Sequence, residues 1–241
     1  LGEKVATIEK VDKAEKVEGT AENGVRVQAT LESGKKLRAQ ALLYAVGRQG
    51  MCGLLKLENC GLEYDDRERL KVNQHYQTSV PHIYAGGDVI GFPALASTAM
   101  EQGRLASCHM FKAPTCSIPD LFPFGIYAVP EISMVGKTEQ QLTEQGIPYE
   151  AGIAQYKEIA RGQLLGDETG MLKMLIHQVD HRILGVHIIG TGATELIHIG
   201  QTAMAFGGTV EFFINNVFNY PTLAECYKVA ALNGLNKLMN V

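Results

Sequence analysis

The segment from His82 to Gly91 places one carboxylate directly after a short apolar run and two glycines. Residues Ile83 to Ala85 predict a short buried strand, and Gly86 and Gly87 lead from its end to Asp88. In open α/β sheets, ligands bind beyond the carboxyl ends of the strands, and glycines there let the backbone approach a ligand closely. Asp88 is therefore a candidate ligand contact. The same residues also suit a simple turn, because glycine and aspartate are both favoured in turns.

The stretch that follows predicts a helix from about Leu95 to Phe111. Small and apolar residues recur in it at helical spacing, which suits a helix packed closely on a sheet. These residues are Leu95, Ala99, Gly103, Ala106 and Met110. Core packing alone explains every one of these apolar positions, so they carry no functional information by themselves.

The composition limits the possible classes of protein. The chain has 241 residues, of which 46% are hydrophobic, and a formal net charge of -4 without a basic cluster. This composition is typical of globular protein and gives no electrostatic footprint for nucleic acid. No apolar run approaches the length that spans a membrane. The five cysteines are Cys52, Cys60, Cys108, Cys116 and Cys226, and their wide spacing is typical of reduced cytoplasmic thiols.

The first part of the chain predicts antiparallel strands. From Val5 to Val46, segments that alternate apolar and polar residues are separated by the turn signals Asn23-Gly24 and Ser33-Gly34, which indicates a β-meander. The run from Ala41 to Val46 is continuously apolar, as expected for a strand covered on both faces. Because Leu1 is not methionine and no leader sequence is recognisable, we expect the chain to be a fragment of a longer protein.

The region after a proline-containing linker, Pro114 to Pro119, predicts an α+β fold. Thr138 and Gln141 fit a capping box, and two strands from Leu172 to Gln178 and from Ile183 to Ile189 form a hairpin. Two further helices are expected. The first runs from about Thr194 to Phe206, with Leu196, Ile199, Ala203 and Phe206 on one side, and the second runs from an N-cap at Thr222, with Glu225 in the capping-box position, to about Leu238.

Four motifs occur in the same order as in the FAD-dependent pyridine nucleotide disulfide oxidoreductases, and together they span nearly the whole chain. They are Tyr44 to Arg48, Thr78 to Asp88, Leu184 to Glu195, and Asn219 to Glu225. The resemblance implies a mixed α/β and α+β architecture. Residues 1–47 would be the end of an NAD(P)-binding domain, residues 48–117 the returning segment of an FAD-binding domain, and residues 118–241 a dimerisation domain. A homodimer or higher homo-oligomer would form through this last part.

The resemblance also gives the candidate site a role. Asp88 matches the residue that accepts a hydrogen bond from a ribityl hydroxyl of FAD, behind Gly86 and Gly87, where a Cβ would collide with the cofactor. Leu95 and Ala96 match the helix start at the flavin ring, where unpaired N–H groups stabilise negative charge on the reduced flavin. No G-x-G-x-x-G is present, so the dinucleotide loops should lie upstream. We therefore expect FAD in the full-length protein but not in this fragment.

Tyr220 separates two enzymatic alternatives. Members that reduce disulfides carry a catalytic histidine at this position, paired with the residue matched by Glu225, whereas Phe218 stands at a second position that is histidine in some relatives. A phenol is too weak an acid to exchange protons with a thiolate at neutral pH. The resemblance therefore favours hydride transfer between NADPH and NAD⁺ through FAD, without a catalytic protein residue. A dihydrolipoamide dehydrogenase-like disulfide reductase, or a non-catalytic dimerisation module for the fragment alone, remain as alternatives. Glu225 could be a helix cap or a catalytic group.

Other polar residues suggest no additional site. His177, His181 and His187 surround a hairpin but lack the accompanying pattern of a metal site, so they are expected to be ordinary strand histidines. Arg161 and Asp167 flank a glycine-containing segment without a recognisable role.

Overall fold

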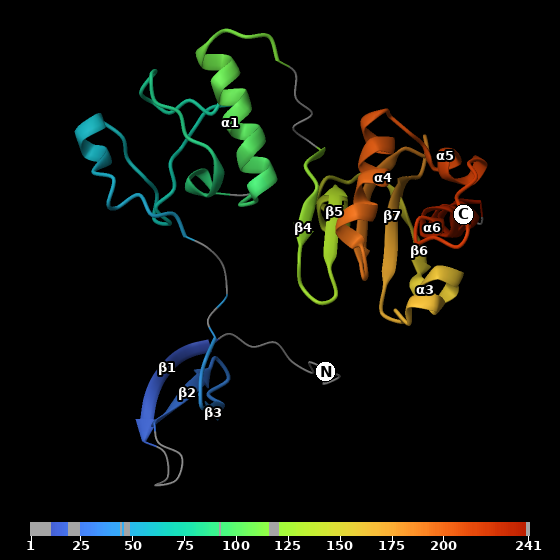
Figure 1. Ribbon diagram of the computed structural model, residues 1–241, viewed down its shortest axis with the longest axis horizontal. Helices are drawn as coiled ribbons and strands as arrows, with labels where there is room; N and C mark the ends of the chain where they lie inside the picture. The colour runs from blue at the N-terminus through green and yellow to red at the C-terminus, as the bar shows by residue number, and fades with distance from the viewer. Residues whose placement is uncertain are drawn as a thin grey trace. The chain divides into compact units, whose positions relative to one another are not determined.

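The computed structural model describes residues 11–18, 25–43, 45, 49–91, 93–115 and 121–239. The chain divides into two compact units, Leu1–Arg48 and Gln49–Val241. Figure 1 shows strands in the first unit and a mixture of helices and strands in the second. Among the described residues, no helix combines the length and apolar character needed to cross a membrane.

The first unit contains a three-stranded antiparallel meander. Strands β1 (Val11–Glu18), β2 (Val25–Leu31) and β3 (Lys36–Ala39) pair in the order β1-β2-β3. Gly34 forms the second turn with a φ of 82°, and its N–H donates to the carbonyl of Leu31 at 2.8 Å. The predicted meander is therefore confirmed. The other turn signal, Asn23-Gly24, lies outside the described residues.

The strand expected from Ala41 to Val46 is wrong for the positions that the structure describes. Residues 41–43 and 45 have no regular structure, and Leu43 is 88% exposed. A continuously apolar strand needs neighbours on both edges and cover on both faces. The described part of the unit supplies only the small meander, so these apolar side chains stay exposed.

Residues 49–115 fold around a small core and one long helix. The elements are η1 (Leu57–Cys60), η2 (Gly87–Ile90) and α1 (Ala96–Met110). The core is formed by Cys52, Leu57, Leu62 and Leu70, with Val80, Ile83, Ala85, Val89 and Ile90 packed against it. The strand predicted from Ile83 to Ala85 is wrong. Only Tyr84 forms a bridge, with Gln77, because no other described strand lies beside it to extend a sheet.

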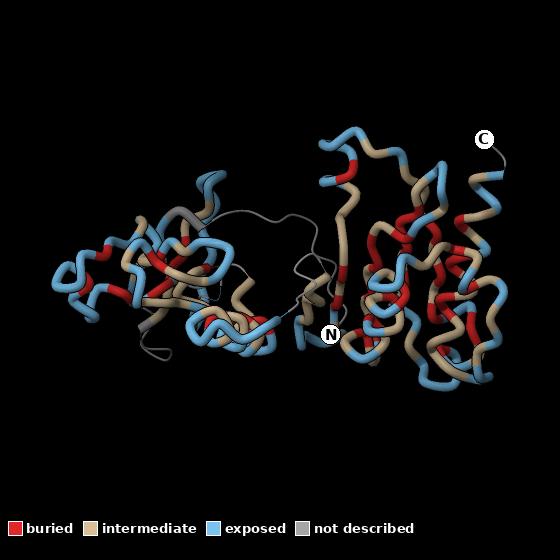
Figure 2. Tube along the Cα trace, turned by 90° about the horizontal axis from the view of Figure 1, so that it is seen from above, coloured by how far each residue is buried: buried red, intermediate tan, exposed pale blue. Residues whose placement is uncertain are grey.

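The rest of the second unit is built on a five-stranded antiparallel sheet. Its order is β4-β5-β8-β7-β6, and the hairpin that the sequence predicts is present as β7 and β8, inside the sheet. The strands are β4 (Phe124–Ile126), β5 (Ile132–Gly136), β6 (Tyr149–Gln155), β7 (Met171–His177) and β8 (Ile183–Ile189). Every residue of the central strands β7 and β8 is buried or half-buried (Figure 2).

Five α-helices and one 3₁₀ turn complete this part of the described chain. They are α2 (Glu139–Glu144), η4 (Tyr156–Glu158), α3 (Ala160–Leu165), α4 (Ala193–Ala205), α5 (Val210–Asn215) and α6 (Glu225–Leu238). Helix α4 packs on β5 and β8, and α6 packs on β6 and β7. The capping box of Thr138 and Gln141 is present at the start of α2, as predicted. The mixed architecture confirms the predicted fold class.

Two helices bury faces that overlap only in part with the expected ones. In α1 the buried residues are Thr98, Gln102 and Ala106, whereas Gly103 and Met110 are exposed. In α4, Ala203 is buried and Leu196 and Ile199 pack against the core, as expected, but Ile197 and Gly200 are also buried and Phe206 is 88% exposed. The sequence pattern missed these faces because polar Thr98 and Gln102 and small Gly200 are buried against close neighbours, and apolar periodicity does not mark such residues.

Candidate functional site

The turn that carries Gly86, Gly87 and Asp88 packs directly against helix α1. The N–H of Gly87 donates to the Oε1 of Gln102 at 2.6 Å. A Cβ on Gly87 would lie 3.2 Å from the Cβ of Ala99, and Gly87 has a φ of 78°. A Cβ on Gly86 would lie 3.3 Å from the Cβ of Gln102. Close packing on the helix therefore favours glycine at both positions, and the positive φ favours it further at Gly87.

Leu95 and Ala96 lie at the amino end of that same helix. Leu95 is the N-cap residue, and its side chain makes no capping hydrogen bond. The first turn contains no acidic side chain, and Ala96 is exposed. The first N–H groups of a helix lack partners within the helix, and the helix dipole makes this end electropositive. The amino end of α1 can therefore donate to an electron-rich ligand.

The structure thus brings the two candidate segments together on one helix. Ala99, which meets Gly87, lies about one helical turn beyond Leu95 and Ala96. Asp88, within η2, is half-buried at this junction. A carboxylate acceptor and a set of backbone donors therefore flank the same end of α1. Gln102 was not singled out from the sequence, since a glutamine in a helix gives no signal until its partner is known.

Residues 218–224 form a loop before α6 that is exposed at residues 219–221. The Tyr220–Pro221 peptide is cis, and Tyr220 is 70% exposed. Phe218 is held in place by the core, where its ring lies 6.2 Å from that of Phe213 in a stacked arrangement. Tyr220 therefore stands at the surface, while its neighbour two residues earlier is structural.

The capping box expected at Thr222 and Glu225 is wrong. Helix α6 begins at Glu225 with Ala224 as its N-cap, and the Thr222 hydroxyl instead donates to the carbonyl of Asn219 at 2.7 Å. The Oε2 of Glu225 is buried and has no hydrogen-bond partner in the described chain. Glu225 is therefore not a helix cap.

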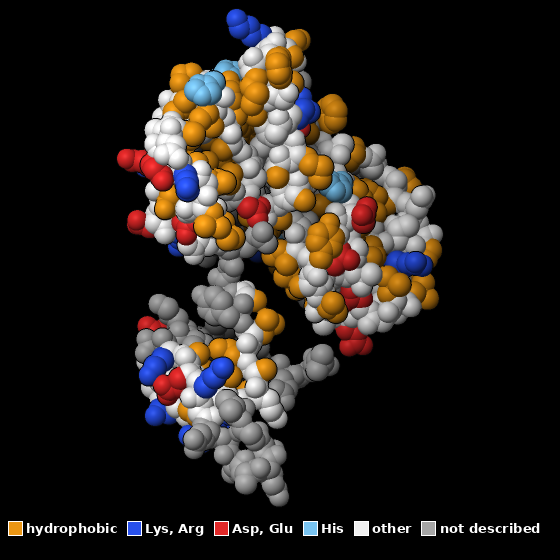
Figure 3. Space-filling model, turned by 60° about the vertical axis from the view of Figure 1, so that its left-hand side comes forward, with side chains coloured by type: hydrophobic (Ala, Val, Ile, Leu, Met, Phe, Trp, Pro, Cys, Tyr) orange, Lys and Arg blue, Asp and Glu red, His pale blue; other side chains and the backbone are white. Residues whose placement is uncertain are grey.

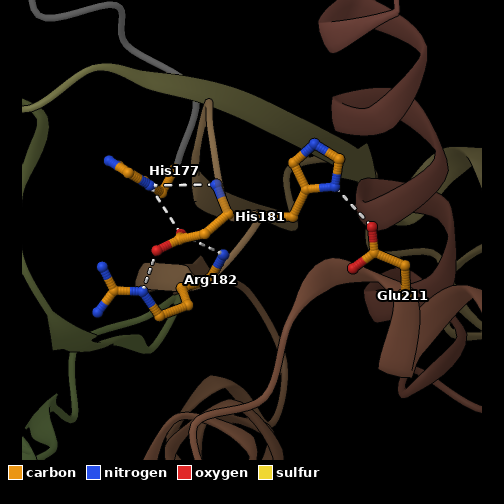
Figure 4. A network of polar contacts seen from close by, with 5 residues as sticks. His177, His181, Arg182 and Glu211 are labelled. Atoms are coloured by element: carbon orange, nitrogen blue, oxygen red, sulfur yellow. Dashed lines mark hydrogen bonds and ion pairs between the residues drawn. The ribbon is translucent and has the colours of Figure 1, made fainter.

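The histidines around the β7–β8 hairpin act in polar contacts that hold the hairpin and α5 (Figure 4). Asp180 joins the Nδ1 of His177 at 2.7 Å and the Nε of Arg182 at 2.6 Å. The Nδ1 of His181 meets the Oε1 of Glu211, on α5, at 2.6 Å. Although partial burial opposes it, hydrogen bonds from Arg182 and His177 lower the pKa of Asp180 to about 2. Within the described ranges, no His, Cys, Asp and Glu group is arranged for a metal.

Asp167, which the sequence leaves without a role, fixes the amino end of α4. Its carboxylate accepts hydrogen bonds from the N–H groups of Gly170 at 2.8 Å and Thr191 at 2.8 Å. Glu131 accepts from the hydroxyl of Thr194 at 2.7 Å and from its N–H at 3.2 Å. Both carboxylates are therefore structural, and sequence reasoning missed Glu131 because its partners lie 63 residues away.

Two family descriptions match this chain. Residues 4–103 match the pyridine nucleotide-disulphide oxidoreductases, and residues 122–231 match the dimerisation domain of the pyridine nucleotide-disulphide oxidoreductases. The chain belongs to the pyridine nucleotide-disulphide oxidoreductase family. The resemblance drawn from the four sequence motifs is confirmed. Members of this family are flavoproteins that use pyridine nucleotides, which is consistent with the candidate site at α1.

Curated relatives in this family are similar over most of the chain. The soluble pyridine nucleotide transhydrogenase of Mycobacterium tuberculosis is 56% identical over 209 residues, which are 87% of this chain and 45% of the relative. The soluble pyridine nucleotide transhydrogenase of Salmonella paratyphi B is 54% identical over 228 residues, which are 93% of this chain and 48% of the relative. The chain therefore spans about half the length of these curated relatives.

Solved structures of the family share the fold. The crystal structure of LpdA from Mycobacterium tuberculosis matches with a TM-score of 0.76 and 24% identity, over 86% of this chain and 45% of that one. The flavoprotein disulfide reductase RclA from Escherichia coli matches with a TM-score of 0.77 and 26% identity, over 86% of this chain and 48% of that one.

Proposed function

We propose that the whole protein is a soluble pyridine nucleotide transhydrogenase, which transfers a hydride between NADPH and NAD⁺ through FAD. The observation that carries this proposal is 56% identity over 87% of the chain to relatives of that name. In this reading, residues 1–47 end the NAD(P)-binding domain, 48–117 return to the FAD-binding domain, and 118–241 form the dimerisation domain. The break between compact units at Arg48 supports the first boundary. We also place the protein in the cytoplasm, in line with its free cysteines.

The residues that would hold FAD are Gly86, Gly87, Asp88, Leu95 and Ala96. Asp88 would accept a hydrogen bond from a ribityl hydroxyl, and the uncapped amino end of α1 would donate to the electron-rich edge of the flavin. These residues fit the group, because the helix end has no side-chain cap and no acidic residue in its first turn. When bound, FAD supplies the redox chemistry, and the protein positions it and tunes its charge.

Tyr220 supports hydride transfer over disulfide reduction. Disulfide reduction needs a group that moves a proton to and from a thiol, and a tyrosine is poorly matched to that task at neutral pH. Hydride exchange between two nicotinamides needs no such group. Tyr220 stands exposed on its cis-proline loop. In a homodimer formed through residues 118–241, this loop would be available to contact a second copy.

The second candidate function is a disulfide reductase of the lipoamide dehydrogenase type. It is favoured by the fold shared with LpdA and with the disulfide reductase RclA. The two functions differ in whether a thiol takes part, so thiol alkylation separates them. We propose the transhydrogenase because sequence identity to the relatives of that name is more than twice as high.

The test is Tyr220→Phe in the full-length protein, with hydride transfer from NADPH to an NAD⁺ analogue as the readout. The rate should stay within about tenfold of the parent, because a lost general acid or base typically costs about 10²–10⁴-fold. Tyr64→Phe is the matched control, because Tyr64 is an exposed tyrosine that lies outside residues 118–241. Reduction of lipoamide or glutathione disulfide is measured in parallel, before and after alkylation.

Two results would contradict the proposal. One is robust disulfide turnover that alkylation abolishes, which would establish a reductase. The other is full-length protein without bound flavin. We expect stoichiometric flavin absorbance from the full-length protein and none from the 241-residue chain, which lacks a G-x-G-x-x-G loop to hold the pyrophosphate.

A further inference from the structure

A cavity of about 790 Å³ lies at the carboxyl end of α1, away from the helix end that carries Leu95 and Ala96. Its volume is in the range of small-molecule sites. Its lining comes from the loop around His75, from Tyr84, and from the last turn of α1 and the residues after it. The full lining is Gln74, His75, Tyr76, Tyr84, Leu105, Cys108, His109, Met110, Lys112, Ala113, Pro114 and Thr115. Figure 3 shows one face of the molecule, on which histidine side chains lie among hydrophobic side chains.

Two imidazole rings form the aromatic wall of this cavity. The rings of His75 and His109 stack with their centroids 4.2 Å apart and their planes within 8°. The ring of Tyr84 lies 5.7 Å from that of His109 in a tilted arrangement. His75 is exposed, so one face of the stack is open to a further planar group. Stacked or tilted rings at this separation attract each other beyond the area they bury.

We assign the proton on His109 from a chain of hydrogen bonds. The Nε2 of Gln77 donates to the carbonyl of Pro81 at 2.8 Å and to the hydroxyl of Tyr84 at 3.3 Å. The Tyr84 oxygen therefore accepts, and we assign its own hydrogen to the contact with the Nδ1 of His109 at 2.7 Å. In a neutral imidazole one nitrogen accepts and the other donates. The remaining nitrogen of His109, Nε2, is then an N–H donor.

We assign the proton on His75 in the same way. The Nε2 of Gln74 lies 3.2 Å from the Nε2 of His75, and an amide nitrogen can only donate. The Nδ1 of His75 is then the N–H donor. Both stacked rings therefore offer donors to a ligand, and their accepting lone pairs are occupied by Tyr84 and Gln74. A metal ion needs those lone pairs, so a cation is not the expected occupant.

Two further donors line the cavity. Lys112 supplies an ammonium group, which has only donors. The Oγ1 of Thr115 accepts from Arg104 at 3.2 Å, so its hydrogen is left to donate. None of the described residues that line the cavity is acidic. The polar part of this cavity is therefore complementary to an anion.

The backbone around the cavity is held in an unusual conformation. Tyr76 has a φ of 61° and Lys112 a φ of 54°, and side chains other than glycine rarely adopt such values. Residues held in sparsely populated regions cluster at ligand sites, because the surrounding structure must enforce them. At Lys112 the value also belongs to the end of α1, where the N–H of Ala113 donates to the carbonyl of Cys108 at 2.9 Å, as in a common helix C-terminal cap.

We propose that this cavity binds a planar aromatic ring that carries an anionic group, as a mononucleotide does. The ring would stack on the open face of His75, and the anion would accept hydrogen bonds from His109, Lys112 and Thr115. A free oxyanion would leave most of the volume and the aromatic wall without a contact. A neutral ring would leave the hydrogen-bond donors without an acceptor. The site is separate from the flavin contacts, which lie at the other end of α1.

The test is a titration of the 241-residue chain with 5′-AMP, followed by proton NMR of the histidine rings. Ring-current shifts of the Hε1 signals of His75 and His109 should saturate together, with the two signals assigned through His75→Ala and His109→Ala. Adenosine alone and inorganic phosphate alone should bind at least about tenfold more weakly than 5′-AMP, because each satisfies only half of the site. His82→Ala, an exposed histidine outside the cavity, should bind 5′-AMP as the parent does.

Lys112→Gly separates loss of binding from loss of folding. Glycine suits a φ of 54°, so this variant should unfold at a higher denaturant concentration than the parent. It should nevertheless bind 5′-AMP at least about threefold more weakly, because the ammonium group is gone. The proposal is overturned if millimolar 5′-AMP leaves both histidine signals unmoved, if phosphate alone binds as tightly as 5′-AMP, or if Lys112→Gly binds with parental affinity.

Discussion

The buried Oε1 of Gln102 accepts a hydrogen bond from the buried N–H of Gly87 at 2.6 Å. This contact fastens the turn before Asp88 to the face of α1. Gln102→Leu would leave the Gly87 N–H buried without a partner, which costs about 1–3 kcal/mol. We expect lower stability of residues 49–115 and faster hydrogen exchange at the Gly87 amide. Ser107→Leu, on the exposed face of α1, should leave the exchange rate unchanged.

The packing of α6 on the sheet depends on a glycine in β6. A Cβ on Gly152 would lie 2.1 Å from the carbonyl oxygen of Ala230 and 3.1 Å from the backbone nitrogen of Gly234. Gly152→Ala should therefore push the helix from the strand and destabilise the domain by about 1–3 kcal/mol or more. Urea denaturation measures this change. Gly103→Ala, in an exposed helical position with open space around it, should instead stabilise by about 0.5–1 kcal/mol.

The stability of the sheet should depend on pH through His187. Burial lowers the pKa of His187 below its ordinary value of 6.5, against the opposing effect of its hydrogen bond to the Lys137 carbonyl. The unfolded chain then binds the proton more readily, so this contribution to stability is present above pH 6.5 and decreases as the pH falls below it.

His187→Gln, whose side chain can still donate to Lys137, removes this titration. Urea unfolding at about pH 7.5 and about pH 5.5 should show a smaller loss of stability on acidification in the variant than in the parent chain. His198→Gln, at an exposed position on α4, is the control and should behave as the parent does. Equal losses in parent and His187→Gln would contradict the prediction.

Residues 118–241 should form a homodimer. Large apolar side chains stand at the surface of its described part, among them Val217, 94% exposed, and Phe206, 88% exposed. A stable homodimer interface buries roughly 2,000 Å² or more in total. Light scattering should therefore give twice the mass of the chain at micromolar concentration. Phe206→Asp combined with Val217→Asp should lower the measured mass toward that of the monomer. Leu54→Asp, at a similarly exposed position outside this region, should leave the mass unchanged.

Local sequence signals predicted the elements whose partners lie nearby. The meander, the β7–β8 hairpin and the capping box at Thr138 depend on turn residues and on neighbours a few positions away. The strands expected at Ile83 to Ala85 and at Ala41 to Val46 depend on distant partners. Where the described chain supplies no neighbouring strand, a β-prone sequence has nothing to pair with, and it remains irregular.

At the candidate site, too, the sequence predicted local features but not contacts between distant residues. The sequence placed Gly86, Gly87 and Asp88 at a turn and Leu95 at a helix start, and the structure has both. It could not reveal that Gln102 joins them, because a buried glutamine is recognised only by its partner. The stack of His75 on His109 was also hidden, since 34 positions of sequence separate two rings that lie 4.2 Å apart.

Each of the two separate cores contains one buried cysteine, whose reaction with a thiol reagent can report on that core alone. Cys52 lies in the core around Leu57 and Cys226 in the core of the large sheet, and both are fully buried. Burial raises the pKa of both thiols, that of Cys226 to about 12, so neither is reactive while its surroundings stay closed. The labelling rate of each cysteine by a thiol reagent therefore reports how often its own core opens, with exposed Cys60 giving the rate of an unprotected thiol.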